Sequence, residues 1–222
     1  MILANMRGRL TAGDLQLMLL LLARGSATRR RQLTACLEGE GPDVLLDSPE
    51  LAERLQAVRT LLAPSEVLYF YVMVRHHLLA AGVEDRDVAD YVAALLLEFG
   101  RRDRAIRVDW NDDHAHRYLV DILADLDATQ GARRFRVMVH LGNYSLWLTG
   151  LFPQYIEARR LRRGGPDLSY YDALGRRGFA MARDHVLADA YHLDRILDTA
   201  AERYPTLRGA LNELSERVLF VH

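Results

Sequence analysis

The sequence RRFRVMVHLGNYSLWLTGLF, residues 133–152, is the stretch that decides the fold. Apolar residues dominate it without a turn signal, over a length typical of a long helix. Five polar side chains nevertheless interrupt the apolar run: His140, Asn143, Tyr144, Ser145 and Thr149. An unpaired polar group in a protein interior costs about 1–3 kcal/mol, so each of them needs a partner or a task. We therefore expect a central helix whose polar groups bond to neighbouring helices or line a pocket.

Helix signals recur along the rest of the chain. Ser48-Pro49 sets a capping hydroxyl before a proline, an arrangement that begins many helices. Residues 67–74 are continuously apolar, as in a buried strand, but the run reaches Gly82 without a turn signal, which favours a helix. Asp112 or Asp113 is expected to cap a helix through Leu126, and residues 183–203 predict one long amphipathic helix. The sequence thus predicts an all-α fold, a multi-helix bundle of about eight to ten helices.

The length of 222 residues suits one domain with a single large core. Residues 38–47 are rich in glycine and acidic residues and contain Pro42, which makes them the best linker candidate. We expect a single helical domain over residues 1–222, with an N-terminal helical subdomain over 1–47 as the alternative. The chain ends in an apolar tail, LFVH, expected to pack on the body or on a second subunit, so a homodimer stays open.

Composition limits the classes of partner. Twenty-nine basic residues face 30 acidic residues, so no global field attracts nucleic acid or anionic lipid. The longest leucine-rich run, Leu15 to Ala23, is shorter than the roughly 20 apolar residues that span a bilayer. The lone Cys36 excludes an intrachain disulfide and fits a reducing compartment. We expect a cytoplasmic protein that binds neither nucleic acid nor membrane.

The central helix also holds the main candidate site. At helical spacing, His140, Tyr144 and Trp147 share one face, and Asn143 lies beside them. Gly142 and Gly150 allow another helix or a ligand to approach closely. One interpretation is a tightly packed helix. The other is a pocket lined by these four polar and aromatic residues.

A second candidate is a metal site. His185, Asp189 and His192 share one helix face at i, i+4 and i+7, a spacing at which imidazole and carboxylate bind one metal. A further cluster combines Asp112, Asp113, His114 and His116. Helical bundles that hold two metal ions use Glu-x-x-His motifs. Asp113 with His116, and Asp189 with His192, have the same spacing, but aspartate replaces glutamate in both. Surface histidines and structural salt bridges are the alternative explanation.

A resemblance joins the central helix to a later segment. LGNYSLWLTGLFPQYI, followed by DLSYYDALGRRGF, resembles an uncharacterised family of bacterial all-helical proteins. The matching residues are Gly142, Asn143, Tyr144, Ser145, Leu146, Thr149, Gly150, Phe152, Tyr170, Tyr171 and Gly175. At position 143 the chain has an amide where the family pattern has an acid. The resemblance implies an all-helical fold and gives no information on activity, and it predicts that Tyr170 and Tyr171 lie near the central helix.

Two functions follow from these patterns. The first is a non-enzymatic protein that binds a partner or a small ligand through His140, Asn143, Tyr144, Trp147, Tyr170 and Tyr171, without a cofactor. The second is a metal-dependent oxidase with a ferritin-like or heme-oxygenase-like helical core, in which His185, Asp189 and His192 bind a metal ion. The sequence contains no glycine-rich phosphate loop, nucleophile elbow or His-Glu-x-x-His motif.

Overall fold

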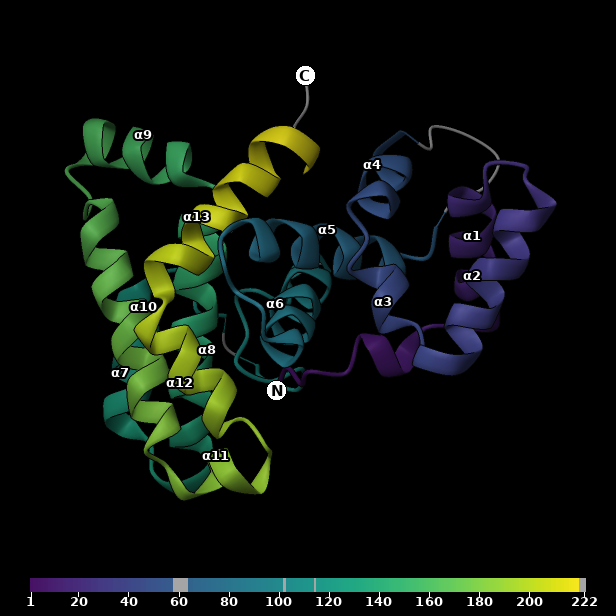
Figure 1. Cartoon of the computed structure of the whole chain (residues 1–222). Helices are drawn as coiled ribbons and strands as arrows, with labels where there is room; N and C mark the ends of the chain where they lie inside the picture. Colours follow the sequence, from purple (N-terminus) through teal and green to yellow (C-terminus); the bar gives the residue numbers. More distant parts are fainter. Residues whose placement is uncertain (58–63, 102, 114, 220–222) are drawn as a thin grey trace. The chain divides into compact units, whose positions relative to one another are not determined.

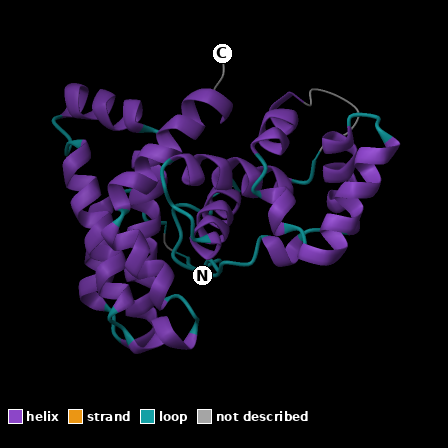
Figure 2. Ribbon diagram, in the orientation of Figure 1, coloured by secondary structure: helices purple, strands orange, loops and turns teal. Residues whose placement is uncertain are grey.

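A computed structural model describes residues 1–57, 64–101, 103–113 and 115–219 of the chain. Within these residues every regular element is a helix, as Figure 2 shows, so the predicted all-α class is confirmed. They form thirteen α-helices rather than the eight to ten expected. Two of them, α3 and α11, are only about one turn long, too short for an apolar period to be visible in the sequence.

The helices fall into two groups along the chain (Figure 1). The first comprises η1 (Arg7–Arg9), α1 (Ala12–Ala23), α2 (Ala27–Glu40), α3 (Asp43–Leu46), α4 (Pro49–Ala57), α5 (Glu66–Ala80) and α6 (Arg86–Phe99). The second comprises α7 (Leu119–Ala128), α8 (Gly131–Leu151), α9 (Pro153–Arg163), α10 (Leu168–Arg183), α11 (Val186–Ala190), α12 (Asp194–Glu202), α13 (Tyr204–Leu214) and η2 (Ser215–Leu219).

The chain divides into two compact units. The N-terminal unit is Ala4–Ala94, and the C-terminal unit is Met1–Leu3 with Leu95–His222. The division falls within α6, well beyond residue 47, where the sequence suggested a subdomain boundary. Whether the chain behaves as one domain or more stays a prediction.

A buried ion pair organises part of the N-terminal unit. Arg75 of α5 is buried, and its guanidinium donates to both carboxylate oxygens of Asp47, at 2.6 and 3.1 Å. Arg86 donates to the same carboxylate at 2.6 Å. Burial alone would raise the pKa of Asp47, but these two arginines hold it below its usual value. Two cations thus stabilise one carboxylate, and the carboxylate compensates the charge of the buried Arg75.

The central helix predicted from residues 133–152 is α8. It is buried along most of its length and packs beside α10 and α13 (Figure 1). Two glycines bring α8 and α10 together: a Cβ on Gly178 would lie 2.7 Å from the backbone nitrogen of Gly142. A Cβ on Gly142 would lie 2.5 Å from the ring of Phe179. These glycines are therefore sites of helix packing rather than of ligand approach.

Helix boundaries confirm some predictions and contradict others. The ambiguous run at 67–74 lies in α5, and Pro49 begins α4, as expected. The helix predicted over 183–203 is wrong, because the chain forms α11 and α12 with a break between them, where His192 adopts a left-handed φ of 55°. Asp112 and Asp113 do not cap a helix, since α7 begins at Leu119.

The predicted apolar tail consists of residues 219–222. The apolar tail lies outside the described residues, except for the backbone of Leu219. Among the described helices, none combines the length and apolar character needed to cross a bilayer.

Candidate functional site

Thr149, one of the polar groups on α8, faces α13, whereas the buried hydroxyl of Ser145 has no hydrogen-bond partner among the described residues. Thr149 donates its hydroxyl to the carbonyl of Ser145 at 2.9 Å, and its oxygen lies 3.3 Å from the hydroxyl of Tyr204 on α13. Asn212 of α13 donates to the carbonyls of Thr149 and Gly150 at 2.9 and 2.7 Å. These polar groups join α8 to α13, so the packing interpretation holds for this end of α8.

Aromatic rings form a column along another face of α8. The ring of His140 lies 6.1 Å from Tyr144 and 5.7 Å from Phe99, measured between centroids. Trp147 continues the column at 6.2 Å from Tyr144 and contacts Phe152 at 4.9 Å. The predicted shared face of His140, Tyr144 and Trp147 therefore exists, but it is packed against other rings.

His140 is a buried, neutral imidazole. Burial, with repulsion from Arg104 and His116, lowers its pKa to about 3. Its Nε2 atom has no hydrogen-bond partner within the described residues. It lines a cavity of only about 10 Å³ together with Asn143. That volume suits one water molecule and no larger ligand, so His140 and Asn143 do not form the predicted ligand pocket.

Tyr144 joins the column to the segment that precedes α7. Its hydroxyl donates to the carbonyl of Arg117 at 3.2 Å. Burial, and then the neighbouring hydroxyls of Tyr171 and Tyr155, raise the pKa of Tyr144 to about 12, whereas Arg159 opposes that rise. Tyr144 lies on α8, Tyr155 and Arg159 lie on α9, and Tyr171 lies on α10, the helix that packs against α8. The predicted meeting of α8 with the segment of Tyr171 therefore occurs.

A larger cavity lies at the starts of α7 and α10, and we call it the tyrosine pocket. Its volume is about 350 Å³. It is lined by Tyr118, Leu119, Val120, Arg159, Pro166, Tyr170 and Tyr171. The ring of Tyr171 is 4% exposed, whereas Tyr118 and Tyr170 are 46% and 43% exposed. The pocket thus has one buried tyrosine and two tyrosines that remain open to solvent.

Helix ends position these side chains. Tyr118 and Leu119 begin α7, and Pro166 precedes Asp167, the residue that caps α10. Tyr170 and Tyr171 lie in the first turn of α10, where their rings make an edge contact at 6.2 Å between centroids. The pocket is therefore formed where α7 and α10 start, beside the body of α9.

Arg159 is the charged group of the tyrosine pocket. Its guanidinium lies over the ring of Tyr118, 4.8 Å from the centroid, which is a cation–π contact. No carboxylate of the described residues forms an ion pair with it. Its neighbour Arg160, in contrast, donates twice to Glu157, at 2.9 and 2.6 Å. Arg159 is thus held in place by an aromatic ring rather than by an opposite charge.

The predicted site divides into two parts. Tyr170 and Tyr171 line the tyrosine pocket and Tyr144 lies close to it, whereas His140, Asn143 and Trp147 belong to the packed column. Sequence reasoning missed Tyr118 and Arg159. The basic helix end ARRLRRGGP was visible, but nothing in it distinguished Arg159 from the arginines beside it.

The predicted metal set does not share a helix face. His185 precedes α11 and its Nδ1 accepts from the backbone of Leu187 at 3.2 Å, while His192 follows α11 in a left-handed conformation. The i, i+4, i+7 spacing with Asp189 therefore does not apply. Among the described residues no group of three or more His, Cys, Asp or Glu side chains is arranged to hold a metal ion.

The second acidic and histidine cluster lines a cavity of about 410 Å³. Arg133 donates to Asp112 at 2.7 Å and to Asp125 at 2.5 Å. The Nε2 atom of His116 lies 3.1 Å from Asp125. Both carboxylates are thus paired with side chains of the protein itself. His114, which the sequence placed in this cluster, lies outside the described residues.

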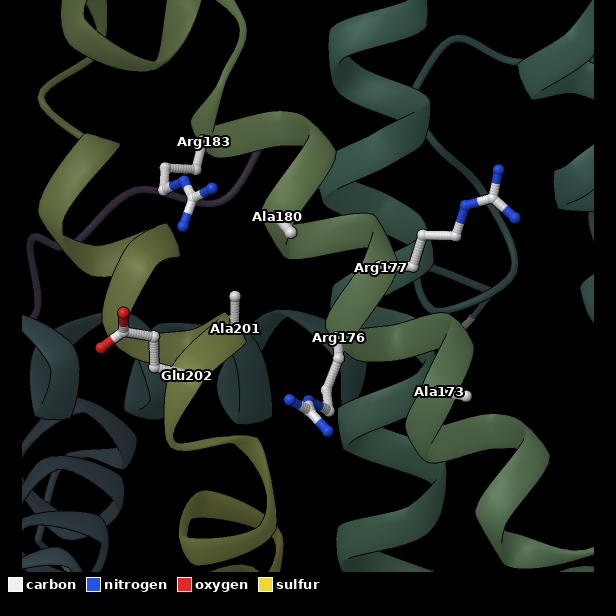
Figure 3. Close-up of a pocket in the computed structure, with 7 residues that line it drawn as sticks. All are labelled: Ala173, Arg176, Arg177, Ala180, Arg183, Ala201 and Glu202. Carbon is white, nitrogen blue, oxygen red and sulfur yellow. The ribbon is translucent and has the colours of Figure 1, made fainter.

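A third cavity, also of about 410 Å³, lies between α10 and α12. Figure 3 shows alanine methyls along it, with Arg176 extending toward Glu202 and Arg177 extending to the opposite side of α10. Arg183 at one end is paired with Asp184 and Asp198, each at 2.8 Å. The residues that line this groove are alanines and the charged Arg176, Arg177, Arg183 and Glu202, with no aromatic ring among them, so it lacks the aromatic surface of the tyrosine pocket.

Comparisons with known proteins returned no match: neither protein-family models, nor curated proteins, nor solved structures are similar to the chain at a significant level. The resemblance of residues 141–179 to a bacterial helical family stays a prediction.

Proposed function

We propose that this chain is a binding protein that takes a small ligand in the tyrosine pocket. One observation carries the proposal: a cavity of about 350 Å³ is bordered by tyrosines that are left partly exposed. That volume lies at the lower end of the roughly 300–1,000 Å³ typical of ligand pockets. Val120 at its edge is 66% exposed, so apolar and aromatic surface continues beyond the cavity. Such surface at a concave site is typical of recognition.

The construction of the pocket supports the same function. The lining residues come from the starts of two helices and the body of a third, so the cavity is formed before a ligand arrives. A preformed site avoids the ordering cost of a loop that must fold around its ligand. Binding of a protein partner at the same residues, the other form of the sequence prediction, stays a prediction.

A fragment screen tests the proposal. Aromatic fragments that are neutral, anionic or cationic are added to ¹⁵N-labelled protein, and amide shifts are mapped along the chain. We expect bound fragments to shift the amides of Leu119, Val120, Tyr170 and Tyr171. Tyr170→Ala is expected to weaken binding about three- to ten-fold, because a ring contact contributes about 0.5–1.5 kcal/mol.

Tyr191→Ala is the matched control. Tyr191 is 42% exposed and has an aromatic neighbour, Phe135, at 5.9 Å, but it does not line the tyrosine pocket. Its substitution should leave fragment affinity unchanged. If no fragment shifts the pocket amides, or if both substitutions weaken binding equally, the proposed function is wrong.

A further inference from the structure

We propose that the tyrosine pocket selects a planar aromatic anion, with Arg159 as its counter-ion and the tyrosine rings as its stacking surface. This inference rests on the proposed function and adds the chemical class of the ligand. The shared chemistry is a carboxylate attached to a flat apolar body. It follows from three features of the pocket: an arginine that no carboxylate of the described residues pairs with, a helix start whose first two residues line the cavity, and acidic neighbours that do not line it.

Arg159 is the first feature. It is half-buried beside the rings of Tyr118, Tyr144 and Tyr171, which hold no opposite charge. A planar guanidinium presents a fork of N–H donors that matches a carboxylate in two parallel hydrogen bonds. The guanidinium carbon lies 4.8 Å from the centroid of the Tyr118 ring, and no carboxylate of the described residues pairs with its N–H donors.

The start of α7 is the second feature. Leu119 and Val120, the first two residues of this helix, line the pocket. The N–H groups of a first helical turn have no partner within the helix, and the helix dipole adds partial positive charge there. An anion at this position therefore meets Arg159 and a helix start together.

The acidic neighbours are the third feature. Asp121 accepts from the backbone nitrogen of Tyr118 at 3.0 Å, so it serves the start of α7. Asp167 accepts from the nitrogen of Tyr170 at 3.0 Å and from the hydroxyl of Ser169 at 2.8 Å. Both carboxylates are used as local caps, and neither lines the pocket. Arg159 is therefore the charged side chain among the residues that line the cavity.

A cationic aromatic ligand is the alternative to the proposed anion. Tyrosine rings bind ammonium groups when several faces surround the cation. Here the guanidinium of Arg159 already occupies the face of Tyr118 and repels a second cation. Tyr170, which is 43% exposed, can still stack on a neutral or anionic aromatic ligand. Charge thus decides the class of ligand, and the aromatic surface decides its shape.

Three isosteric probes separate these classes. 2-Naphthoate, 2-naphthamide and 2-naphthamidinium share one bicyclic ring and differ in charge. Titration calorimetry gives their affinities, and amide shifts locate them. We expect naphthoate to bind about ten-fold or more tightly than naphthamide, since a charge-assisted bond contributes about 1.5–3 kcal/mol. Naphthamidinium should bind weakest, and the preference for naphthoate should shrink in 0.5 M salt.

Substitutions on one helix provide the control. Arg159→Gln should abolish the preference for naphthoate while leaving naphthamide affinity unchanged, and Arg159→Lys should retain part of that preference. Arg160→Gln removes a neighbouring arginine that is paired with Glu157 and should change nothing. Equal binding of the three probes, or equal effects of the two Gln variants, overturns this inference and leaves the proposed function standing. If none of the probes shifts the pocket amides, both are overturned.

Discussion

His140 links the burial of one side chain to the pH dependence of stability. Its folded-state pKa of about 3 lies below the ordinary histidine value of 6.5, because the ring is enclosed and has cationic neighbours. Between about pH 3 and pH 6.5, the imidazole of His140 is therefore mostly protonated in the unfolded chain and neutral in the folded chain. Stability contributed by the neutral imidazole is complete above pH 6.5 and is lost as the pH falls toward 3.

The free energy of unfolding should fall more steeply with falling pH when His140 is present than when it is replaced. Between pH 6 and 5 the wild-type protein should lose on the order of 1 kcal/mol more than His140→Leu, which lacks the titrating group. Urea unfolding at both pH values measures this difference. His192→Gln is the control, because His192 is exposed. A wild-type slope equal to that of His140→Leu would contradict the pKa assignment.

At the residue level the sequence predicted part of the site. Tyr170 and Tyr171 were visible because the family pattern joined them to α8, and they do line the pocket. Tyr118 and Arg159 were invisible, since a cation–π contact between distant parts of the sequence has no local signature. The burial of His140 among aromatic rings was equally unpredictable. Helical spacing shows which residues share a face of the helix, but not which residues pack against that face.

The contact between α8 and α10 is the central contact of the C-terminal unit. Gly178 lets the two backbones approach so closely that a Cβ would lie 2.7 Å from the nitrogen of Gly142 and 2.9 Å from the carbonyl oxygen of Met138. Backbone atoms cannot rotate away as a side chain does. A methyl group at this position must therefore separate the helices.

Gly178→Ala is expected to lower the free energy of unfolding by about 2–3 kcal/mol, the upper range for an overpacked core. Gly209→Ala is the matched control, because Gly209 lies within α13 and a Cβ there meets nothing within 4 Å. It should be neutral or stabilise the helix by up to about 1 kcal/mol. Urea unfolding compares the two variants. An unchanged stability of Gly178→Ala would show that the helices can move apart without cost.

Helix starts were predictable from the sequence where a capping residue or a proline marks them. Ser65 and Pro49 mark helix starts chemically, so α4 and α5 were predictable. The break between α11 and α12 was not, because it depends on a left-handed histidine without a glycine or proline to signal it. Local chemistry marks caps well, whereas a turn built from ordinary residues is imposed by packing.

The whole chain consists of two compact units whose division runs through α6, between Ala94 and Leu95. The sequence predicted one domain, because a chain of 222 residues suits a single large core. A continuous helix joins the units covalently but does not by itself make them unfold together. Each unit has its own stabilising feature: the Asp47 ion pair in the N-terminal unit and the α8–α10 contact in the C-terminal unit.

These two features allow the units to be perturbed separately. Asp47→Ala leaves the buried Arg75 without its carboxylate, a change that costs about 3–5 kcal/mol in buried pairs. Hydrogen exchange followed by mass spectrometry should then show faster exchange in residues 4–94 alone. Gly178→Ala should accelerate exchange in residues 95–219 alone. If either substitution accelerates exchange equally along the whole chain, the two units unfold as one cooperative domain, as the sequence predicted.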